Sequence, residues 1–337
     1  MARELGITDI VKLASNESPT EPFPEVLAAI AAAAHQANRY PEDSGYYLVT
    51  ALAARHGIDP SQIWLGAGST QLLGCIALAV GGRETSAVYA SPSFVMYRIS
   101  TLVAGAEPIE VPLDNQARHD LDALLAAVRR DTTVVYVCNP NNPTGTYRSA
   151  ADIAAFIDAV PKSVLVVVDE AYHHYVTAPD YETALSIALD RDNVVVTRTF
   201  SKIYGLAGLR IGYAVGRSET IAGLRRTQPP FSASSVAQVA ALEALAHDDQ
   251  VKARVEANTA GRIQLEEGLA ERGIDYAASQ ANFIGVRLAD DPKEVADRLI
   301  EEGVIVRPLG SIMRVTVGTE EENRRFLKAL DDIGATR

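Results

Sequence analysis

One lysine in this sequence has surroundings that suit covalent chemistry. Lys202 comes shortly after Asn193–Thr197, an apolar run that the pattern predicts to be a buried strand of a parallel sheet. The other five lysines lie in polar or helical stretches, where we expect them to be solvated. Burial disfavours the charged form of a lysine and lowers its pKa, so that the amine becomes a nucleophile that forms Schiff bases. We therefore interpret Lys202 as the candidate catalytic residue, against the simpler alternative of a snorkelling surface lysine.

Two further apolar runs deliver polar side chains in the same way. Thr133–Cys138 leads into a rigid, proline-flanked loop that carries Asn142, and Val164–Val168 is followed directly by Asp169. A carboxylate is costly to bury unless it meets a cation, which is either an arginine of the protein or a cationic nitrogen of a ligand. Open α/β sheets bind ligands beyond the carboxyl ends of their strands. We therefore expect Asn142, Asp169 and Lys202 to face one cleft.

A glycine-rich turn provides a candidate phosphate site. Gly66–Thr70 lies between a predicted strand at Gln62–Leu65 and a predicted helix at Gln71–Val80. Backbone N–H groups and the helix dipole converge at such a turn, and glycine lets a ligand approach the backbone closely. The alternative is an ordinary tight turn in which Ser69 serves only as the N-cap of the helix.

The order of the predicted elements indicates the fold class. Strands and helices alternate up to Gly216, which predicts an α/β domain with a mostly parallel sheet flanked by helices. Beyond Gly216 the pattern changes to long helices and short strands. We predict a large α/β domain over residues 35–230 and a smaller α+β domain formed by residues 1–34 and 231–337.

Composition narrows the class of protein. The net charge of −12 and the lack of a basic cluster argue against nucleic acid or an anionic membrane as a partner. Cys75 and Cys138 each lie in an apolar run, which favours free thiols in a reducing cytoplasm. The segment Met1–Val11 has no apolar stretch of the kind a signal peptide requires. We therefore expect a cytoplasmic protein, and nothing in the sequence suggests a metal site.

Four motifs carry a resemblance to a known family. They are Asn139–Gly145, Asp169–Tyr172, Ser201–Lys202 with Gly208–Arg210, and Arg314–Gly318. Together they resemble the fold-type-I aminotransferases that depend on pyridoxal 5′-phosphate (PLP), and the chain is most similar to the histidinol-phosphate and aromatic amino acid aminotransferase group. The resemblance runs over nearly the whole chain, with the motifs in family order.

The resemblance implies roles for the residues around the cofactor ring. Lys202 would form a Schiff base with PLP (the internal aldimine) and then shuttle a proton as general acid and base. Asp169 would pair with the pyridine nitrogen and keep it protonated. Tyr172 and Asn142 would bond to the ring oxygen O3′, and Phe94 would stack on the ring.

The resemblance also implies how the cofactor phosphate is held. The amides of Ser69 and Thr70 would bind it, with Ser201 and Arg210 as side-chain partners. Tyr40 would reach the phosphate of a neighbouring subunit, which implies a homodimer with shared active sites.

For the substrate, the resemblance implies Arg314 as the anion holder, with Arg307 and Asn142 as further contacts. The donor would be histidinol phosphate or an aromatic L-amino acid, and 2-oxoglutarate the acceptor. Three departures from the family pattern bear on this choice: an N-terminal arm that the family carries is missing or the chain is truncated, Gly68–Gln71 replaces Gly-Ser-Asp-Glu, and the loop between the two arginines is short. Pro230–Val236 and Ser279–Phe283 look like the aromatic branch. A phosphate would be best held by a second cation, for which Arg307 is the candidate, whereas an aromatic amino acid needs only Arg314 for its carboxylate and an apolar wall for its ring, so the sequence slightly favours aromatic or broad specificity.

Other chemistries remain open from the sequence. A decarboxylase, an oxidase or a lyase of the same fold would keep Lys202, Asp169 and Arg210, so these residues do not exclude one. A cofactor-sensing regulator would bring a DNA-binding domain, of which the sequence shows no sign.

Overall fold

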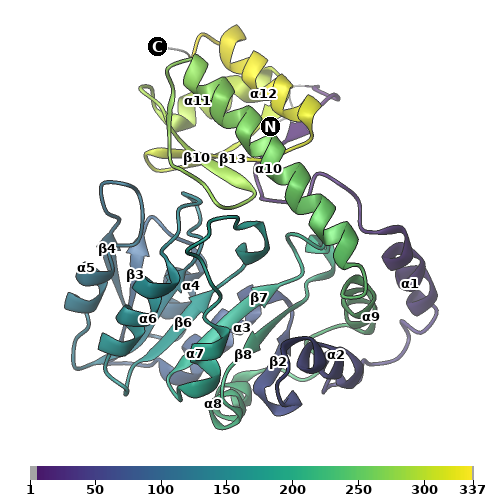
Figure 1. The fold of residues 1–337 in the computed structure, drawn as a ribbon, viewed down its shortest axis with the longest axis vertical. Coiled ribbons are helices and arrows are strands. Elements are labelled where there is room, and N and C mark those ends of the chain that lie inside the picture. The colour runs from purple at the N-terminus through teal and green to yellow at the C-terminus, as the bar shows by residue number, and fades with distance from the viewer. Residues whose placement is uncertain (1–5, 336–337) are drawn as a thin grey trace.

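The computed structural model describes residues 6–335, and the ends of the predicted small domain, residues 1–5 and 336–337, lie outside the described residues. So does the first part of the predicted N-terminal segment Met1–Val11. Figure 1 shows a broad lower part built on a large sheet and a smaller upper part that contains the last helices of the chain. Over the described range, no helix is both long and apolar enough to cross a membrane.

The lower part is organised by a seven-stranded sheet whose strands run parallel with one exception. In order across the sheet, the strands are β2 (Ile63–Gly66), β8 (Gly212–Val215), β7 (Val194–Thr199), β6 (Leu165–Asp169), β5 (Thr132–Cys138), β3 (Ser86–Ser91) and β4 (Glu107–Pro112). The exception is β8, which is antiparallel to both of its neighbours and which the sequence pattern did not predict. The expected α/β fold with a mostly parallel sheet is confirmed.

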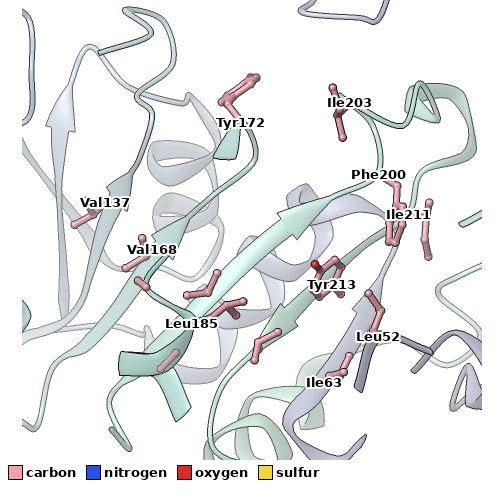
Figure 2. Close-up of a cluster of buried hydrophobic side chains, with 14 of the residues drawn as sticks. Leu52, Ile63, Val137, Val168, Tyr172, Leu185, Phe200, Ile203, Ile211 and Tyr213 are labelled. Carbon is pink, nitrogen blue, oxygen red and sulfur yellow. The ribbon is translucent and has the colours of Figure 1, made fainter. Parts of the chain in front are cut away.

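Helices cover this sheet, and the strands are therefore apolar on both faces. They are α1 (Pro24–Ala34), α2 (Tyr46–His56), α3 (Gly68–Val80), α4 (Met96–Val103), α5 (Leu121–Ala126), α6 (Ala150–Ala159), α7 (Leu185–Asp190), α8 (Ser218–Leu224) and α9 (Ser235–Ala244). Successive residues of β5 alternate between two clusters: Val135 and Val137 belong to one, and Val134 and Tyr136 to the other. Figure 2 shows part of the first cluster, including Val137.

The upper part has two small sheets and its own apolar cluster. One sheet has the order β12 (Arg307–Leu309), β13 (Ile312–Thr316), β10 (Phe283–Arg287) and β9 (Asp275–Tyr276), and the other pairs β1 (Val11–Lys12) with β11 (Val304–Ile305). The helices are α10 (Asp248–Glu271), α11 (Pro292–Glu301) and α12 (Glu320–Asp332). Residues 304–309 are divided between the two sheets, because β11 pairs with the N-terminal segment and β12 pairs with β13.

The long helix α10 runs between the two parts in Figure 1. At its lower end α1 packs against α9, and Phe23 and Val26 belong to the apolar cluster of the large sheet. The upper cluster draws on Leu265 and Leu269, near the other end of α10. The division at residues 35 and 230 stays a prediction.

Candidate active site

The sequence provided twelve candidate site residues, and eleven of them line one cavity. The cavity has a volume of about 500 Å³ and lies at the carboxyl ends of β5, β6 and β7. Those eleven residues are Ser69, Thr70, Phe94, Asn142, Asp169, Tyr172, Ser201, Lys202, Arg210, Arg307 and Arg314. The common cleft follows from the topology, because β5, β6 and β7 are neighbours and parallel.

Lys202 is half-buried and its amine faces backbone oxygens. Its Nζ donates to the carbonyl oxygens of Ser15 at 3.3 Å and Asn16 at 3.1 Å, and lies 5.6 Å from the centroid of the Tyr172 ring. Burial lowers the pKa of Lys202 to about 8, and the positive charge of Arg314 acts in the same direction. A larger share of the amine is therefore uncharged near neutral pH, which is the form that attacks a carbonyl carbon.

Asp169 ends β6 with only one of its two oxygens in use. The residue is 1% exposed, its Oδ2 accepts a hydrogen bond of 2.9 Å from the Tyr97 hydroxyl, and its Oδ1 has no partner among the described residues. Burial raises the pKa of Asp169 to about 6. Buried polar atoms without a partner are rare in native proteins, so Oδ1 fits a ligand that brings its own donor, such as a protonated ring nitrogen.

Two more polar groups face the cavity with one side already bonded. The Tyr172 hydroxyl accepts from Nδ2 of Asn16 at 3.0 Å, and Oδ1 of Asn142 accepts from Nη1 of Arg314 at 2.6 Å. Each residue accepts through its oxygen, so the Tyr172 O–H and the Asn142 amide N–H groups are the donors that they can offer. Two donors side by side fit an oxygen acceptor such as O3′ of the cofactor ring.

The glycine-rich turn forms a cradle at the start of α3. The helix begins at Gly68 with Ala67 as its N-cap, so the alternative in which Ser69 is only the N-cap is wrong. Gly68 has φ +76°, and a Cβ at this position would lie 2.6 Å from Nη2 of Arg210. Nη1 of Arg210 donates to the Ser201 hydroxyl at 3.3 Å. Helix amides, a hydroxyl and a guanidinium thus converge where a phosphate group would fit.

Two arginines stand opposite each other at another wall of the cavity. Arg307 of β12 is paired directly with Arg314 of β13 in the antiparallel ladder, and both line the cavity. Nη2 of Arg314 donates to the carbonyl of Ala14 at 2.7 Å, and its Nε has no partner among the described residues. Burial lowers the pKa of Arg314, and the charge of Arg307 lowers it further. Like charges directly opposite each other destabilise a sheet, and an anion between them would relieve this.

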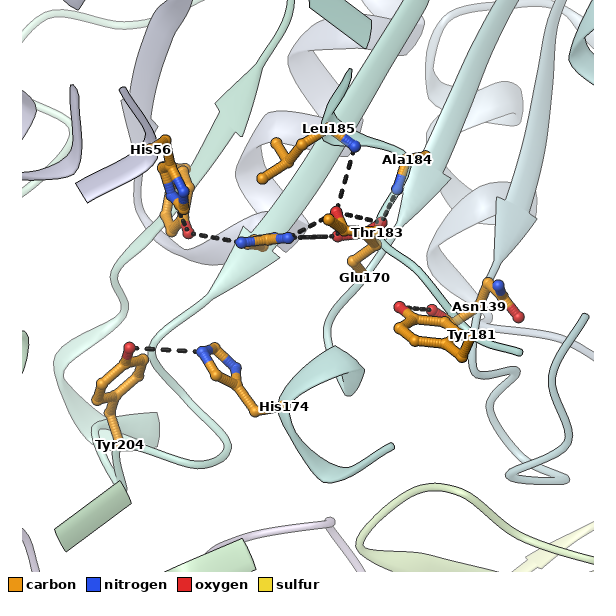
Figure 3. A network of polar contacts seen from close by, with 11 residues as sticks. His56, Asn139, Glu170, His174, Tyr181, Thr183, Ala184, Leu185 and Tyr204 are labelled. Atoms are coloured by element: carbon orange, nitrogen blue, oxygen red, sulfur yellow. Dashed lines mark hydrogen bonds and ion pairs between the residues drawn. The ribbon is translucent and has the colours of Figure 1, made fainter. Parts of the chain in front are cut away.

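The carboxylate that follows Asp169 has a structural task. Glu170 is buried and forms an ion pair of 2.8 Å with the buried Arg198 of β7. It also accepts from the Thr183 hydroxyl at 2.8 Å and from the amide of Ala184 at 2.7 Å, as Figure 3 shows. Because all its partners are protein groups, Glu170 fixes the end of β6 while Asp169 faces the cavity.

Tyr40 is the one selected residue outside this cavity. It is 82% exposed, and its ring stacks on Phe231 with centroids 4.7 Å apart. An exposed stacked pair of aromatic rings is unusual at a free surface and agrees with a contact to another chain.

Sequence reasoning missed two residues of the site, Tyr97 and Asn16. Tyr97 lies in the first turn of α4 and follows Phe94, which lies just before the helix, by three positions. Its closeness to Phe94 in the sequence was the available signal. Asn16 is 1% exposed and has φ +54°, and its contacts join the N-terminal segment to both Tyr172 and Lys202. No local pattern in the sequence predicts that segment to lie over the site.

Comparison with known proteins gives a consistent result. Residues 8–330 match the model of the family described as aminotransferase class I and II. The chain is 42% identical to histidinol-phosphate aminotransferase of Moorella thermoacetica, covering 98% of this chain and 87% of that one. It is 43% identical to histidinol-phosphate aminotransferase 2 of Methylococcus capsulatus, covering 99% and 92%. Among solved structures, histidinol-phosphate aminotransferase of Sinorhizobium meliloti in complex with pyridoxal-5′-phosphate superposes with a TM-score of 0.92 at 31% identity, covering 98% and 92%.

Proposed function

This chain belongs to the class I and II aminotransferases, and we propose that it transfers the amino group of histidinol phosphate to a 2-oxo acid, with 2-oxoglutarate as the acceptor. PLP-dependent transamination is its reaction, and the alternative of a decarboxylase, oxidase or lyase is not favoured. The observation that carries the choice of donor is the pairing of Arg307 with Arg314 at the cavity wall.

The charge of the donor is the physical reason for this choice. A carboxylate carries one negative charge, and a single arginine fork binds it in bidentate fashion. A phosphate monoester carries close to two charges at neutral pH and offers three acceptor oxygens. Two guanidinium groups on adjacent strands match a dianion, whereas for an amino acid Arg307 would be a surplus cation. The names of the Moorella and Methylococcus relatives support the same donor.

The stretches that favoured an aromatic donor have other contacts. The Ser279 hydroxyl donates to the carbonyl of Phe283 at 2.6 Å, and the Ser232 hydroxyl accepts from Gln71 at 2.9 Å. Neither serine lines the cavity. The aromatic alternative therefore loses the support that these stretches gave it, and we set it second.

When bound, PLP supplies an electron sink that makes the hydrogen on the carbon bearing the amino group acidic. In our proposal Lys202 accepts that proton and returns it, since its lowered pKa suits a group that both takes up and releases protons near neutral pH. Asp169 would hold the ring nitrogen through Oδ1, and Tyr172 and Asn142 would donate to O3′. Phe94 would cover the ring.

The remaining polar groups would bind two phosphates, one on the cofactor and one on the substrate. Ser69 and Thr70 of α3, with Ser201 and Arg210, would bind the phosphate of the cofactor. Arg307 and Arg314 would bind that of the substrate. Asn142, which accepts from Arg314, would orient this arginine toward the substrate.

We further propose a homodimer in which Tyr40 reaches the cofactor phosphate of the partner subunit. The exposed position of Tyr40 supports this, as do exposed apolar residues on α4, among them Ile99, Leu102 and Val103. We propose a cytoplasmic location, which agrees with two buried and unpaired cysteines.

A comparison of amino donors tests the proposed substrate. We expect kcat/KM with 2-oxoglutarate to be higher for histidinol phosphate than for phenylalanine, tyrosine or histidine by more than about a hundredfold, roughly 2.7 kcal/mol. An aromatic amino acid that equalled histidinol phosphate would overturn the proposal and restore the aromatic alternative.

A further inference from the structure

We propose that Tyr97 is a positioning residue that acts on the cofactor through Asp169. Its hydroxyl holds one carboxylate oxygen, so that the other stays ionised and directed at the ring nitrogen of PLP. The inference rests on the proposed role of Asp169 and adds a residue that touches neither cofactor nor substrate.

The geometry around Asp169 is the first support. Tyr97 lies on α4 and is completely buried, and its hydroxyl donates to Oδ2 of Asp169 at 2.9 Å. The other oxygen, Oδ1, is buried and has no partner in the part of the chain that the structure describes. A carboxylate with one oxygen bonded to a rigid donor has little freedom to rotate. The contact therefore selects which oxygen is left for the ligand.

The donor is itself held in place by aromatic packing. The Tyr97 ring is stacked on that of Tyr136, with centroids 4.8 Å apart and planes at 11°, and meets the Phe94 ring edge-on at 5.8 Å. Phe94 is the residue that would cover the cofactor ring. The carboxylate is thus supported from the first turn of α4, and the segment just before this helix supplies a wall of the cavity through Phe94.

The protonation of the pair decides the sign of the effect. Burial raises the pKa of Tyr97 well above its ordinary value, so this hydroxyl remains a donor. Burial also raises the pKa of Asp169, and the bond from Tyr97 opposes that rise. Without the hydroxyl, more of Asp169 would carry a proton near neutral pH. A protonated carboxyl no longer offers the negative charge that stabilises a protonated pyridine.

Two substitutions separate this role from packing. Tyr97→Phe keeps the ring and removes only the hydroxyl. Tyr136→Phe is the matched control, because the Tyr136 hydroxyl is buried in the same stack and has no partner among the described residues. Both variants lose one buried oxygen from the stack, but only the first loses a bond to Asp169.

The readout is cofactor affinity, which does not depend on turnover. Apoenzyme is titrated with PLP and with 1-deaza-PLP, in which carbon replaces the ring nitrogen. We expect Tyr97→Phe to weaken PLP binding by about tenfold and 1-deaza-PLP binding by less than about twofold, because only PLP has a nitrogen for Asp169. Tyr136→Phe should leave both affinities within about twofold. Equal losses for the two cofactors, or no loss for either, would overturn the role of Tyr97.

Two further arms complete the test. In an Asp169→Asn background, Tyr97→Phe should no longer change the ratio of the two affinities, since the effect passes through the carboxylate. If Tyr97→Phe does not fold, 3-fluorotyrosine at position 97 replaces it: the contact is kept, the hydroxyl becomes a stronger donor, and the ratio should rise. An unchanged ratio would contradict the proposal.

The wild-type enzyme shows whether a negative result concerns the role of Asp169 or only that of Tyr97. If it does not prefer PLP over 1-deaza-PLP, the role given to Asp169 fails and this inference fails with it. If wild type prefers PLP and Tyr97→Phe prefers it equally, only the role of Tyr97 is wrong.

Discussion

Nη1 of Arg314 donates to Oδ1 of Asn142 over 2.6 Å and thereby joins the small upper sheet to the proline-flanked loop at the end of β5. The bond links the residue that we propose to bind substrate with a residue that we propose to bind the cofactor ring. It also uses the oxygen of the amide, so that the N–H groups of Asn142 are left for O3′. Nε of Arg314 has no partner within residues 6–335, and this N–H group is available to an anion.

Replacing Asn142 by Ala should therefore damage two steps. The cofactor loses a donor to O3′, and Arg314 loses the acceptor that orients it. We expect kcat/KM for histidinol phosphate to fall by more than about tenfold, roughly 1.4 kcal/mol, with both kcat and KM affected. Asn193→Ala is the control, because Asn193 bonds to the carbonyl of Val164 at the opposite end of the sheet. A variant of Asn142 that kept kcat/KM within about twofold would show that the bond has no catalytic role.

Replacing Asp169 by Asn should stabilise the protein without cofactor. The pKa of Asp169 is raised to about 6, above its unfolded value near 3.9, so the folded state keeps a proton that the unfolded state releases as pH rises. The stability cost of ionisation is absent below about pH 4 and fully present above about pH 6, and it amounts to at most about 3 kcal/mol. We expect a higher Tm for the Asn variant than for wild-type apoprotein at pH 7.5 and a smaller difference at pH 4. A gain that is larger at pH 4 would show that the sign is wrong.

Four histidines should make the protein less stable as pH falls, which is opposite to the effect of Asp169. Burial lowers the pKa of His56 and His119 to about 4 and that of His174 to about 3, and lowers that of His173 well below the usual range. Each gains a proton on unfolding below its ordinary pKa near 6.5, so the stability is present above pH 6.5 and is lost as pH falls toward 4. Near pH 5, unfolding takes up protons on these four histidines and releases one from Asp169, with a net uptake of about three protons. This uptake corresponds to a slope of the free energy of unfolding of up to about 4 kcal/mol per pH unit. Thermal unfolding between pH 7 and 4.5 measures this slope. His119→Gln should lower the number of protons taken up on unfolding by about one, and the slope with it. A slope that does not change in this variant would contradict the assignment for His119.

A shared active site predicts complementation between inactive variants. Lys202→Ala lacks the amine, and Tyr40→Ala lacks the residue that would reach across to the partner. In a mixture, each hybrid dimer has one site with both residues intact, so about a quarter of the wild-type activity should return after subunit exchange. The control mixes Lys202→Ala with the double variant Lys202→Ala, Tyr40→Ala and should remain inactive. A Tyr40→Ala enzyme that is fully active, or a mixture with no regained activity, would argue against the shared site.

The sequence was informative wherever a residue's environment depends on its own strand. Apolar runs predicted β5, β6 and β7, and the rule that ligands bind beyond parallel strand ends predicted that Asn142 and Lys202 would share a cleft with Asp169. The helix predicted at Gln71–Val80 is confirmed and begins three residues earlier, at Gly68. The resemblance to known aminotransferases added residues that no periodicity could identify, among them Arg314.

Features that depend on distant segments were not predictable in this way. Asn16 reaches the site because the N-terminal segment crosses from the upper sheet to the lower one, which local patterns do not encode. The pairing of Arg307 with Arg314 depends on the division of residues 304–309 between two sheets, as β11 and β12. The preference for an aromatic donor came in part from stretches whose polar side chains form structural hydrogen bonds.

The phosphate of the donor provides the most direct test of the account. We would measure kcat/KM for histidinol phosphate and for histidinol with 2-oxoglutarate, in wild type, in Arg307→Ala and in Arg287→Ala, whose arginine pairs with Asp275 at 2.7 Å away from the cavity. We expect wild type and Arg287→Ala to prefer the phosphorylated donor by more than about a hundredfold, and Arg307→Ala to lose at least about tenfold of that preference without loss of activity toward histidinol. A wild-type preference within about fivefold, or one that Arg307→Ala leaves unchanged, would contradict the proposal that the arginine pair recognises the phosphate of the substrate.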